Sequence, residues 1–314
     1  MTIQLSLGKG LATGVAFASL LAACGQALSA SSDATELRVD GSSTVFPLTR
    51  EAVRRFERSA QAAQIEVKFS GTAAGFRRFC AGETDISNAS REINAEEQAQ
   101  CKANGVDFRV VPLAMDSIAV VVNPANTWVG DLSVDELKKL WSPSAENKLN
   151  SWRDLRPEWP DRPIVLFGRG QDSGTYDVFT QAIVGTTHSS RQDYKASEDE
   201  EFLANAIAAE PNALGFFGIG AYHRHWDTLK LVAVDAGNGA VFPTLETVAQ
   251  NQYQPLTRPL FLYVSQRSLA DKPLLGRFLA HFLEGLPGWI HFTGYMPLAR
   301  DSYRHSMEAL SKAP

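Results

Sequence analysis

Short apolar strands, small polar loops and helices follow one another repeatedly along this chain of 314 residues, and this order limits the folds that it can adopt. Apolar segments of strand length, such as 36–41, 85–89 and 163–168, each lead into a loop that contains Gly, Ser or Thr. Amphipathic segments such as 47–61 follow these loops. Strands that alternate with helices predict an α/β protein with mainly parallel sheets.

The composition is that of a folded protein rather than of a disordered or fibrous chain. Hydrophobic residues make up 44% and charged residues 21%, and the net charge is -5. These values are close to the averages of globular domains and far from those of disordered chains. A single core rarely exceeds roughly 250–300 residues, so about two domains are expected. The acidic balance argues against a nucleic-acid partner, whose binding needs a basic surface.

The N-terminal segment has the pattern of an export signal. Residues 1–23 contain no Asp or Glu, and the apolar run 11–23 is too short for the roughly 20 residues of a membrane-spanning helix. The run ends in LAAC at 21–24, which resembles a bacterial lipoprotein signal, whose Cys is lipidated and begins the mature chain. An ordinary secretory signal with a chance Cys24 is the alternative. Residues 24–35 are expected to form a flexible tether.

Export would expose two further cysteines to an oxidising compartment. Cys80 and Cys101 lie 21 residues apart and have neither CxxC nor Cys/His spacing, so a zinc site is not expected. An oxidising compartment would allow a disulfide between them. A pair of buried free thiols is the alternative that the sequence leaves open.

Three loops that precede helices carry hydroxyl groups: 41–44 (GSST), 70–72 (SGT) and 172–175 (DSGT). Ligands of α/β proteins bind beyond the carboxyl ends of strands, where helix N-termini present unpaired N–H groups. One such loop alone would be read as a helix cap. Three of them, together with Arg91 and Arg169, favour an oxyanion site, because a guanidinium binds a tetrahedral oxyanion with two parallel hydrogen bonds.

Signatures of other chemistries are absent from the sequence. It contains no GxxxxGK[ST], GxGxxG, GxSxG or HExxH motif. The close pair His223 and His225 is expected to be a surface feature rather than a metal site. The sequence therefore predicts neither a metal nor a cofactor.

Six segments together resemble the periplasmic phosphate-binding protein of the bacterial phosphate ABC importer, the PstS family. They are GSSTVFP (41–47), SGTAAGF (70–76), DISNASR (85–91), MDSIAVVVNP (115–124), GRGQDSGT (168–175) and PLTRPLFLYV (255–264). The resemblance covers nearly all of the chain beyond the leader. The leader and the cysteine pair are similar to those of cyanobacterial lipoprotein members.

The resemblance implies a two-lobed periplasmic binding protein fold, type II-like, in which each lobe is a mainly parallel sheet flanked by helices. Lobe one would comprise 36–120 and 257–314, and lobe two would comprise 121–256. The chain would cross the hinge near Val120–Val121 and Leu256–Arg258. A ligand between the lobes would stabilise the closed state through contacts that only closure completes.

The same resemblance implies a phosphate site made by both lobes. Lobe one would supply Ser43, Thr44, the Val45 backbone, Thr72, Ser90 and Arg91, and lobe two would supply Arg169, Ser173, Gly174 and Thr175. Some members have Asp where this chain has Ser90, and that carboxylate accepts the proton of phosphate and repels sulfate. Asp116 is the expected replacement, ahead of Asp40 and Asp172, and a hinge or capping role for Asp116 is the alternative.

The resemblance implies a receptor, not an enzyme, that closes around inorganic phosphate and delivers it to an ABC import permease in the inner membrane. The protein is expected to be a periplasmic monomer that touches a membrane only through its lipid anchor. Three alternatives stay open: a receptor for sulfate, arsenate or molybdate, an exported phosphatase or hydrolase, and a surface adhesion or sensing module. The net negative charge does not oppose an anionic ligand, because local dipoles and two arginines outweigh distant, screened charges.

Overall fold

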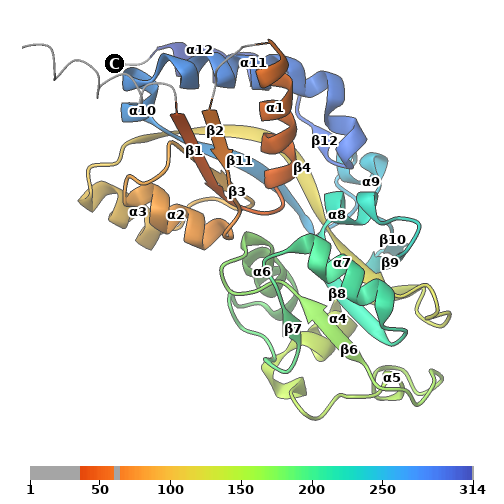
Figure 1. Ribbon diagram of the computed structural model, residues 1–314. Coiled ribbons are helices and arrows are strands. Elements are labelled where there is room, and N and C mark those ends of the chain that lie inside the picture. Colours follow the sequence, from red (N-terminus) through yellow and green to blue (C-terminus); the bar gives the residue numbers. More distant parts are fainter. Residues whose placement is uncertain (1–35, 60–63, 313–314) are drawn as a thin grey trace, which may run out of the picture.

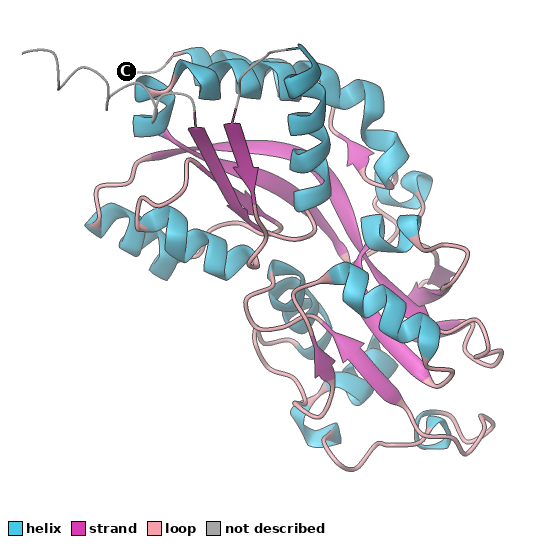
Figure 2. Ribbon diagram, in the orientation of Figure 1, coloured by secondary structure: helices cyan, strands magenta, loops and turns pink. Residues whose placement is uncertain are grey.

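The computed structural model describes residues 36–59 and 64–312. The expected export signal, the tether and Cys24 therefore lie outside the described residues. The described chain forms two lobes of strands and helices, which long strands connect (Figure 1, Figure 2). This is the two-lobed α/β fold that the sequence predicts. None of the described helices is both long and apolar enough to cross a membrane.

The first lobe, in the upper part of Figure 1, is built from both ends of the described chain. In its sheet β2 (Gln64–Val67) pairs with β1 (Glu36–Gly41), β1 with β3 (Ile86–Ala89), β3 with β11 (Thr257–Ser265), and β11 with β4 (Phe108–Val122). Its other elements are α1 (Phe46–Ser59), α2 (Thr72–Cys80), α3 (Ala95–Ala103), α10 (Gln266–Asp271), α11 (Pro273–Trp289), the 3-10 turn η4 (Ile290–Thr293), β12 (Met296–Pro297) and α12 (Arg300–Ser311).

The second lobe, in the lower part of Figure 1, comes from the middle of the chain. Its sheet joins β8 to β4 and β6, β6 to β7, and β9 to β4, β5 and β10. Its elements are β5 (Asp131–Ser133), α4 (Val134–Trp141), η2 (Pro143–Ala145), α5 (Trp152–Leu155), β6 (Val165–Gly168), α6 (Gly174–Phe179), the π-helical turn η3 (Thr180–Val184), β7 (Lys195–Ala196), α7 (Glu200–Ala209), β8 (Ala213–Gly218), α8 (Ile219–Arg224), β9 (Lys230–Asp235), β10 (Ala240–Val241) and α9 (Leu245–Ala249).

Two long antiparallel strands, β4 (Phe108–Val122) and β11 (Thr257–Ser265), carry the chain between the lobes. β4 pairs with β11 as far as Ser117, and from Ile118 onward it pairs with β8 and β9. A single strand thus belongs to the sheets of both lobes. The residue boundaries of the lobes, as expected from the sequence, stay a prediction.

Two details of these strands differ from the expectation. The sequence indicated separate strands at 109–113 and 117–123, whereas 108–122 is one strand. The residues between the two expected strands stay paired with β11 and β12, so the ladder continues through them. The sheets are also mixed, because β4 and β11 run antiparallel to their neighbours while β1, β2 and β3 are parallel to one another.

An aromatic cluster holds α6 against the sheet of the second lobe. The ring of Trp141 lies 4.9 Å from that of Phe216 on β8 and 5.6 Å from that of Phe179 on α6, measured between centroids. Phe179 and Phe216 stack at 3.8 Å. Such pairs contribute about 0.5–1.5 kcal/mol each beyond the burial of their area. This packing fixes α6, whose first residues form part of the third predicted loop.

A disulfide joins Cys80 at the end of α2 to Cys101 on α3. Both residues are buried in a small cluster with Phe76, Phe79 and Tyr263. The bond closes a loop of 21 residues in sequence separation, and such a cross-link stabilises a protein mainly by restricting the unfolded chain. The helices α2 and α3 that it connects flank the second predicted loop and the Ser90–Arg91 segment.

We expect replacement of both Cys80 and Cys101 by Ser to lower the free energy of unfolding by about 3 kcal/mol, from the loop that is no longer closed. Urea denaturation without added ligand measures this change. A thiol reductant should destabilise the unaltered protein to a similar degree and leave the double variant unchanged. An unaltered denaturation midpoint in the double variant would contradict the expected contribution of the bond.

Candidate functional site

The three hydroxyl-bearing loops meet where the two lobes face each other. Each loop follows a strand and leads into a helix: 41–44 lies between β1 and α1, 70–72 between β2 and α2, and 172–175 between β6 and α6. The second and third loops touch through their backbones, because the Ala73 N–H donates to the Asp172 carbonyl at 3.0 Å. The candidate site therefore lies at the contact between the two lobes, which we call the cleft.

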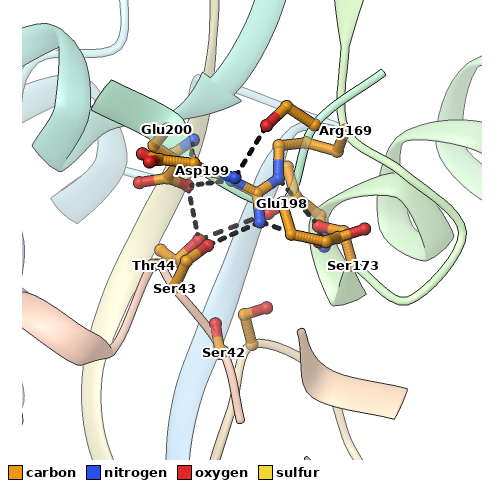
Figure 3. A network of polar contacts seen from close by, with 12 residues as sticks. Ser42, Ser43, Thr44, Arg169, Ser173, Glu198, Asp199 and Glu200 are labelled. Atoms are coloured by element: carbon orange, nitrogen blue, oxygen red, sulfur yellow. Dashed lines mark hydrogen bonds and ion pairs between the residues drawn. The ribbon is translucent and has the colours of Figure 1, made fainter. Parts of the chain in front are cut away.

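Arg169, at the end of β6, occupies the centre of this cleft (Figure 3). It is 1% exposed, and its Nε donates to Ser173 Oγ at 3.0 Å while its Nη2 donates to Ser43 Oγ at 2.5 Å. Nη2 also lies 3.2 Å from Glu198 Oε2, and Nη1 lies 3.4 Å from Glu200 Oε1. One guanidinium thus contacts hydroxyls of both lobes.

The remaining hydroxyls form two pairs beside Arg169. Thr72 Oγ1 lies 3.1 Å from Ser90 Oγ, and Thr44 Oγ1 lies 3.3 Å from Thr175 Oγ1. A Cβ on Gly174 would lie 2.7 Å from the oxygens of both Thr72 and Ser90, so only glycine permits this approach. The structure brings together eight of the predicted residues: Ser43, Thr44, Thr72, Ser90, Arg169, Ser173, Gly174 and Thr175.

The Val45 backbone, the ninth predicted contributor, lies at the start of α1. Its N–H donates to Ser42 Oγ at 3.4 Å, which is a long hydrogen bond. The preceding residue, Thr44, is held by Tyr295, whose hydroxyl donates to the Thr44 carbonyl at 2.8 Å. The first loop is therefore anchored from the C-terminal part of the chain.

Arg91 makes contacts other than those expected of a ligand residue. Its Nη1 and Nη2 each donate to a Glu97 oxygen at 2.7 Å, its Nε donates to Asp177, and Nη1 also donates to the Glu92 carbonyl at 2.9 Å. Its guanidinium lies over the ring of Phe76. Arg91 is therefore directed toward acidic groups, and its role as a phosphate ligand stays a prediction that these contacts do not support.

Asp116, the expected proton acceptor, also accepts hydrogen bonds from other groups of the protein. Its Oδ2 accepts hydrogen bonds from Arg258 Nε at 2.9 Å and Nη2 at 2.8 Å, and its Oδ1 accepts one from the Ile219 N–H at 3.3 Å. Complete burial raises the pKa of Asp116 to about 6, although the nearby Arg258 opposes this shift. The pair joins facing residues of β4 and β11 just before β4 continues into the second lobe, and both roles expected of Asp116 stay predictions.

Asp40 and Asp172, the two less favoured acceptors, form ion pairs of their own. Asp40 accepts a hydrogen bond from Arg78 at 2.7 Å, and Asp172 accepts one from Arg77 at 2.7 Å. Both arginines belong to α2. Neither carboxylate contacts Arg169 among the interactions of the described residues.

Arg258 is a cleft residue that was not among the predicted site residues. It is 2% exposed, and its Nη2 donates to Thr175 Oγ1 at 2.7 Å and to Thr44 Oγ1 at 3.4 Å. Its Nη1 has no hydrogen-bond partner among the described residues. The available signal was an arginine within an otherwise apolar strand, in one of the six segments that carried the family resemblance.

Two further residues that were not predicted, Glu198 and Glu200, flank Arg169 (Figure 3). They belong to the acidic run 198–201, which in sequence looks like the solvent-exposed start of a helix. Burial raises the pKa of Glu198 above its ordinary value, and Arg169 opposes the shift. Only the tertiary structure places these carboxylates against a guanidinium from another loop.

The charged donors of the cleft suit an oxyanion. Two buried guanidinium groups and several hydroxyls converge there, and guanidinium groups pair closely with tetrahedral oxyanions. Over residues 36–59 and 64–312, no group of three or more His, Cys, Asp or Glu could hold a metal ion. His225 lies outside the cleft network and pairs with Glu201 at 2.7 Å.

Comparisons with known proteins show the family. A family model described as a PBP superfamily domain matches residues 28–284. Protein SphX from Synechocystis sp. is 42% identical over 93% of this chain and 87% of its own length. Phosphate-binding protein PstS from Staphylococcus epidermidis is 31% identical over 93% of this chain and 89% of its own length.

A solved structure from Planctomyces limnophilus, described as a possible phosphate binding protein, shares 35% identity with this chain. The alignment covers 88% of this chain and 98% of that one, with a TM-score of 0.64. The likeness therefore spans both lobes and is not limited to the loops. Since the family model and the curated relatives cover most of the sequence, the chain belongs to the PBP superfamily of substrate-binding proteins, with PstS phosphate-binding proteins among its relatives.

Proposed function

We propose that this protein is an extracytoplasmic receptor that binds inorganic phosphate between its lobes and delivers it to an ABC import permease. The observation that carries the proposal is Arg169, a buried guanidinium that contacts Ser43 in one lobe and Ser173 in the other. An oxyanion held by these groups would touch both lobes only when they are closed. Ligand binding would therefore favour the closed state, which a permease could recognise.

The donors of the cleft are sufficient for useful affinity. Hydrogen bonds that involve a charged group contribute about 1.5–3 kcal/mol each. A micromolar dissociation constant corresponds to about 8 kcal/mol in total. Two guanidinium groups and the hydroxyls around them could provide this free energy after the costs of desolvation and closure.

The names of the relatives and the chemistry of the cleft both favour phosphate binding over catalysis. The relative from Staphylococcus epidermidis is named a phosphate-binding protein. Ser43 and Ser173, the hydroxyls nearest Arg169, both accept hydrogen bonds from its guanidinium. A guanidinium cannot act as the general base that a nucleophilic serine requires, so this arrangement suits binding. In this role the protein would be a periplasmic monomer, anchored by lipid at Cys24 if its leader is processed as expected.

Calorimetry of the purified protein with phosphate, arsenate, sulfate and molybdate tests the proposal. We expect phosphate to bind with a micromolar or lower dissociation constant and sulfate to bind far more weakly. Tight sulfate binding without a phosphate signal would instead indicate a receptor for another oxyanion. Hydrolysis of a phosphate ester that is lost in Ser173→Ala would indicate an exported hydrolase. Phosphate uptake that does not change when the permease is deleted would favour an adhesion or sensing module.

The contacts of Arg91 predict a role in closure. Asp177 lies on α6 of the second lobe, so its ion pair with Arg91 joins the lobes. The other carboxylate oxygen of Asp177 lies 2.6 Å from His188 Nε2. Asp177→Asn removes the charge from this contact and leaves the pairing of Arg91 with Glu97 intact. We expect phosphate to dissociate at least about tenfold faster, because a buried charged hydrogen bond contributes about 1.5–3 kcal/mol. Stopped-flow measurement of ligand release checks this rate.

An exposed pair between the same lobes provides the control. Arg77 of α2 and Asp172 are both about half-exposed and lie 2.7 Å apart. Exposed pairs contribute only about 0–1 kcal/mol, so Arg77→Gln should change the release rate by less than about fivefold. Equal release rates for the unaltered protein and Asp177→Asn would exclude Asp177 from the closure mechanism.

A further inference from the structure

One buried carboxylate oxygen in the cleft lacks a hydrogen-bond partner among the described residues. It is Oε2 of Glu200, the first residue of α7, whose side chain is 3% exposed. A buried polar atom without a partner costs free energy and is uncommon in folded proteins. An acceptor of this kind inside a binding cleft marks a position at which a ligand could donate a hydrogen bond.

The other oxygen of Glu200 fixes the carboxylate beside the predicted ligand residues. Oε1 accepts a hydrogen bond from Thr44 Oγ1 at 2.8 Å and one from the Gly218 N–H at 3.3 Å. It also lies 3.4 Å from Arg169 Nη1. Figure 3 shows the carboxylate next to the Arg169 guanidinium and to Thr44. Glu200 therefore contacts one predicted ligand residue from each lobe.

The other carboxylates that could serve as acceptors are more fully paired or more exposed. Asp116 Oδ2 receives two hydrogen bonds from Arg258. Glu198, the second carboxylate beside Arg169, directs Oε2 to that guanidinium and is about a quarter exposed. Of these three side chains, Glu200 alone combines near-complete burial with a carboxylate oxygen that no described residue occupies.

We propose that Glu200 accepts a hydrogen bond from the hydroxyl that phosphate carries and so excludes sulfate. In some family members an Asp at the position of Ser90 performs this task. This role rests on the proposed phosphate-binding function. At neutral pH phosphate still carries a hydroxyl that can donate, whereas sulfate is fully ionised. A carboxylate can only accept, so it bonds to the first anion and repels the second.

The position of Glu200 has a consequence for when selection occurs. Ser90 follows β3 in the first lobe, whereas Glu200 begins α7 in the second. An acceptor on the second lobe reaches a ligand bound to first-lobe groups only as the lobes close. Selection between phosphate and sulfate would therefore act at closure rather than at first encounter, because the anion meets the carboxylate only then.

Glu200→Gln tests the role, because it keeps the size of the side chain, removes its charge and adds a donor. Calorimetry with phosphate, arsenate and sulfate should show phosphate affinity reduced at least about tenfold and sulfate affinity increased. Arsenate also carries a proton and should lose affinity as phosphate does. The ratio of phosphate to sulfate affinity is the decisive measurement, because a purely structural role would weaken both anions alike.

Glu198→Gln is the matched control, since it removes a charge beside the same guanidinium. It should change the affinities for phosphate and sulfate by the same factor and leave their ratio unchanged. Glu200→Asp serves as a second variant if the Gln variant does not fold. It shortens the side chain, so that the carboxylate oxygens lie farther from the ligand, and it keeps the charge. It should weaken phosphate while sulfate stays excluded, and unchanged phosphate affinity in this variant would overturn the role.

Other outcomes would also overturn the assignment. An unchanged affinity ratio in folded Glu200→Gln would exclude Glu200 while leaving phosphate binding itself intact. A ratio that falls in Asp116→Asn but not in Glu200→Gln would move the acceptor to Asp116. An unaltered protein that binds neither phosphate nor arsenate would refute the proposed function, and with it the ligand proton that Glu200 is proposed to accept.

Discussion

Arg169→Ala is expected to weaken phosphate binding by at least about 2 kcal/mol, which is roughly thirtyfold in the dissociation constant. Arg169 is almost completely buried and contacts Ser43 and Ser173 from opposite lobes. Alanine would remove the central cation and leave Glu198 and Glu200 without this guanidinium. An anionic ligand would then meet two carboxylates that the Arg169 guanidinium no longer faces, so the loss exceeds that of a neutral hydrogen bond.

Calorimetry with phosphate measures this loss, and two variants separate its causes. Arg169→Lys keeps the charge but cannot form two parallel hydrogen bonds, so an intermediate affinity is expected. Arg77→Ala removes an arginine that is half-exposed and pairs with Asp172, and that contacts none of the cleft hydroxyl groups among the described residues. It should leave affinity nearly unchanged. A folded Arg169→Ala protein with an unaltered dissociation constant would remove Arg169 from the site.

Arg258→Met is expected to lower the free energy of unfolding by about 3–5 kcal/mol, the cost of breaking a buried ion pair by removing one partner. Arg258 donates twice to Asp116, which is completely inaccessible to solvent. Without the guanidinium, the Asp116 carboxylate would be buried as an uncompensated charge or would take up a proton. Urea denaturation of the ligand-free protein measures the change.

The double variant Asp116→Leu with Arg258→Met separates the effect of the pair on folding stability from its effect on phosphate binding. Replacing both members of a buried pair by apolar residues is often neutral for stability. We therefore expect the double variant to regain most of the lost stability. Phosphate binding should stay weak, because Arg258 also donates to Thr175 and lies near Thr44. Full stability in Arg258→Met alone would show that the pair does not hold the two strands together.

Local sequence patterns located most of the candidate site. The loops at 41–44, 70–72 and 172–175 follow strands and precede helices, and such loops lie at the carboxyl edge of a sheet. Strands β1 and β2 are parallel neighbours, so their loops necessarily lie at the same edge. The hydroxyls and Arg169 could therefore be predicted, because short segments determine both the residue types and the direction in which the chain leaves each strand.

Two other arginines, Arg91 and Arg258, show where local patterns fail. Arg91 follows a loop serine and looks like a ligand residue, but Glu97 on α3 and Asp177 on α6 bind its guanidinium. Arg258 looks like an isolated charge in a strand, but the register of β11 against β4 places it directly opposite Asp116. Asp177 and Asp116 lie 86 and 142 positions from the arginines that they bind, so no local pattern could have paired them.

The sequence alone predicts the α/β class, the three hydroxyl loops and the family resemblance, because each depends on residue types at short spacing. Which charges face one another depends instead on the tertiary structure. The pairing of Asp116 with Arg258 depends on the register of two strands whose residues lie 142 positions apart. The contact of Glu200 with Thr44 depends on how the two lobes meet. Charge pairing at such distances follows from packing of the whole chain, and a buried acceptor can be recognised only after every neighbouring donor has been placed.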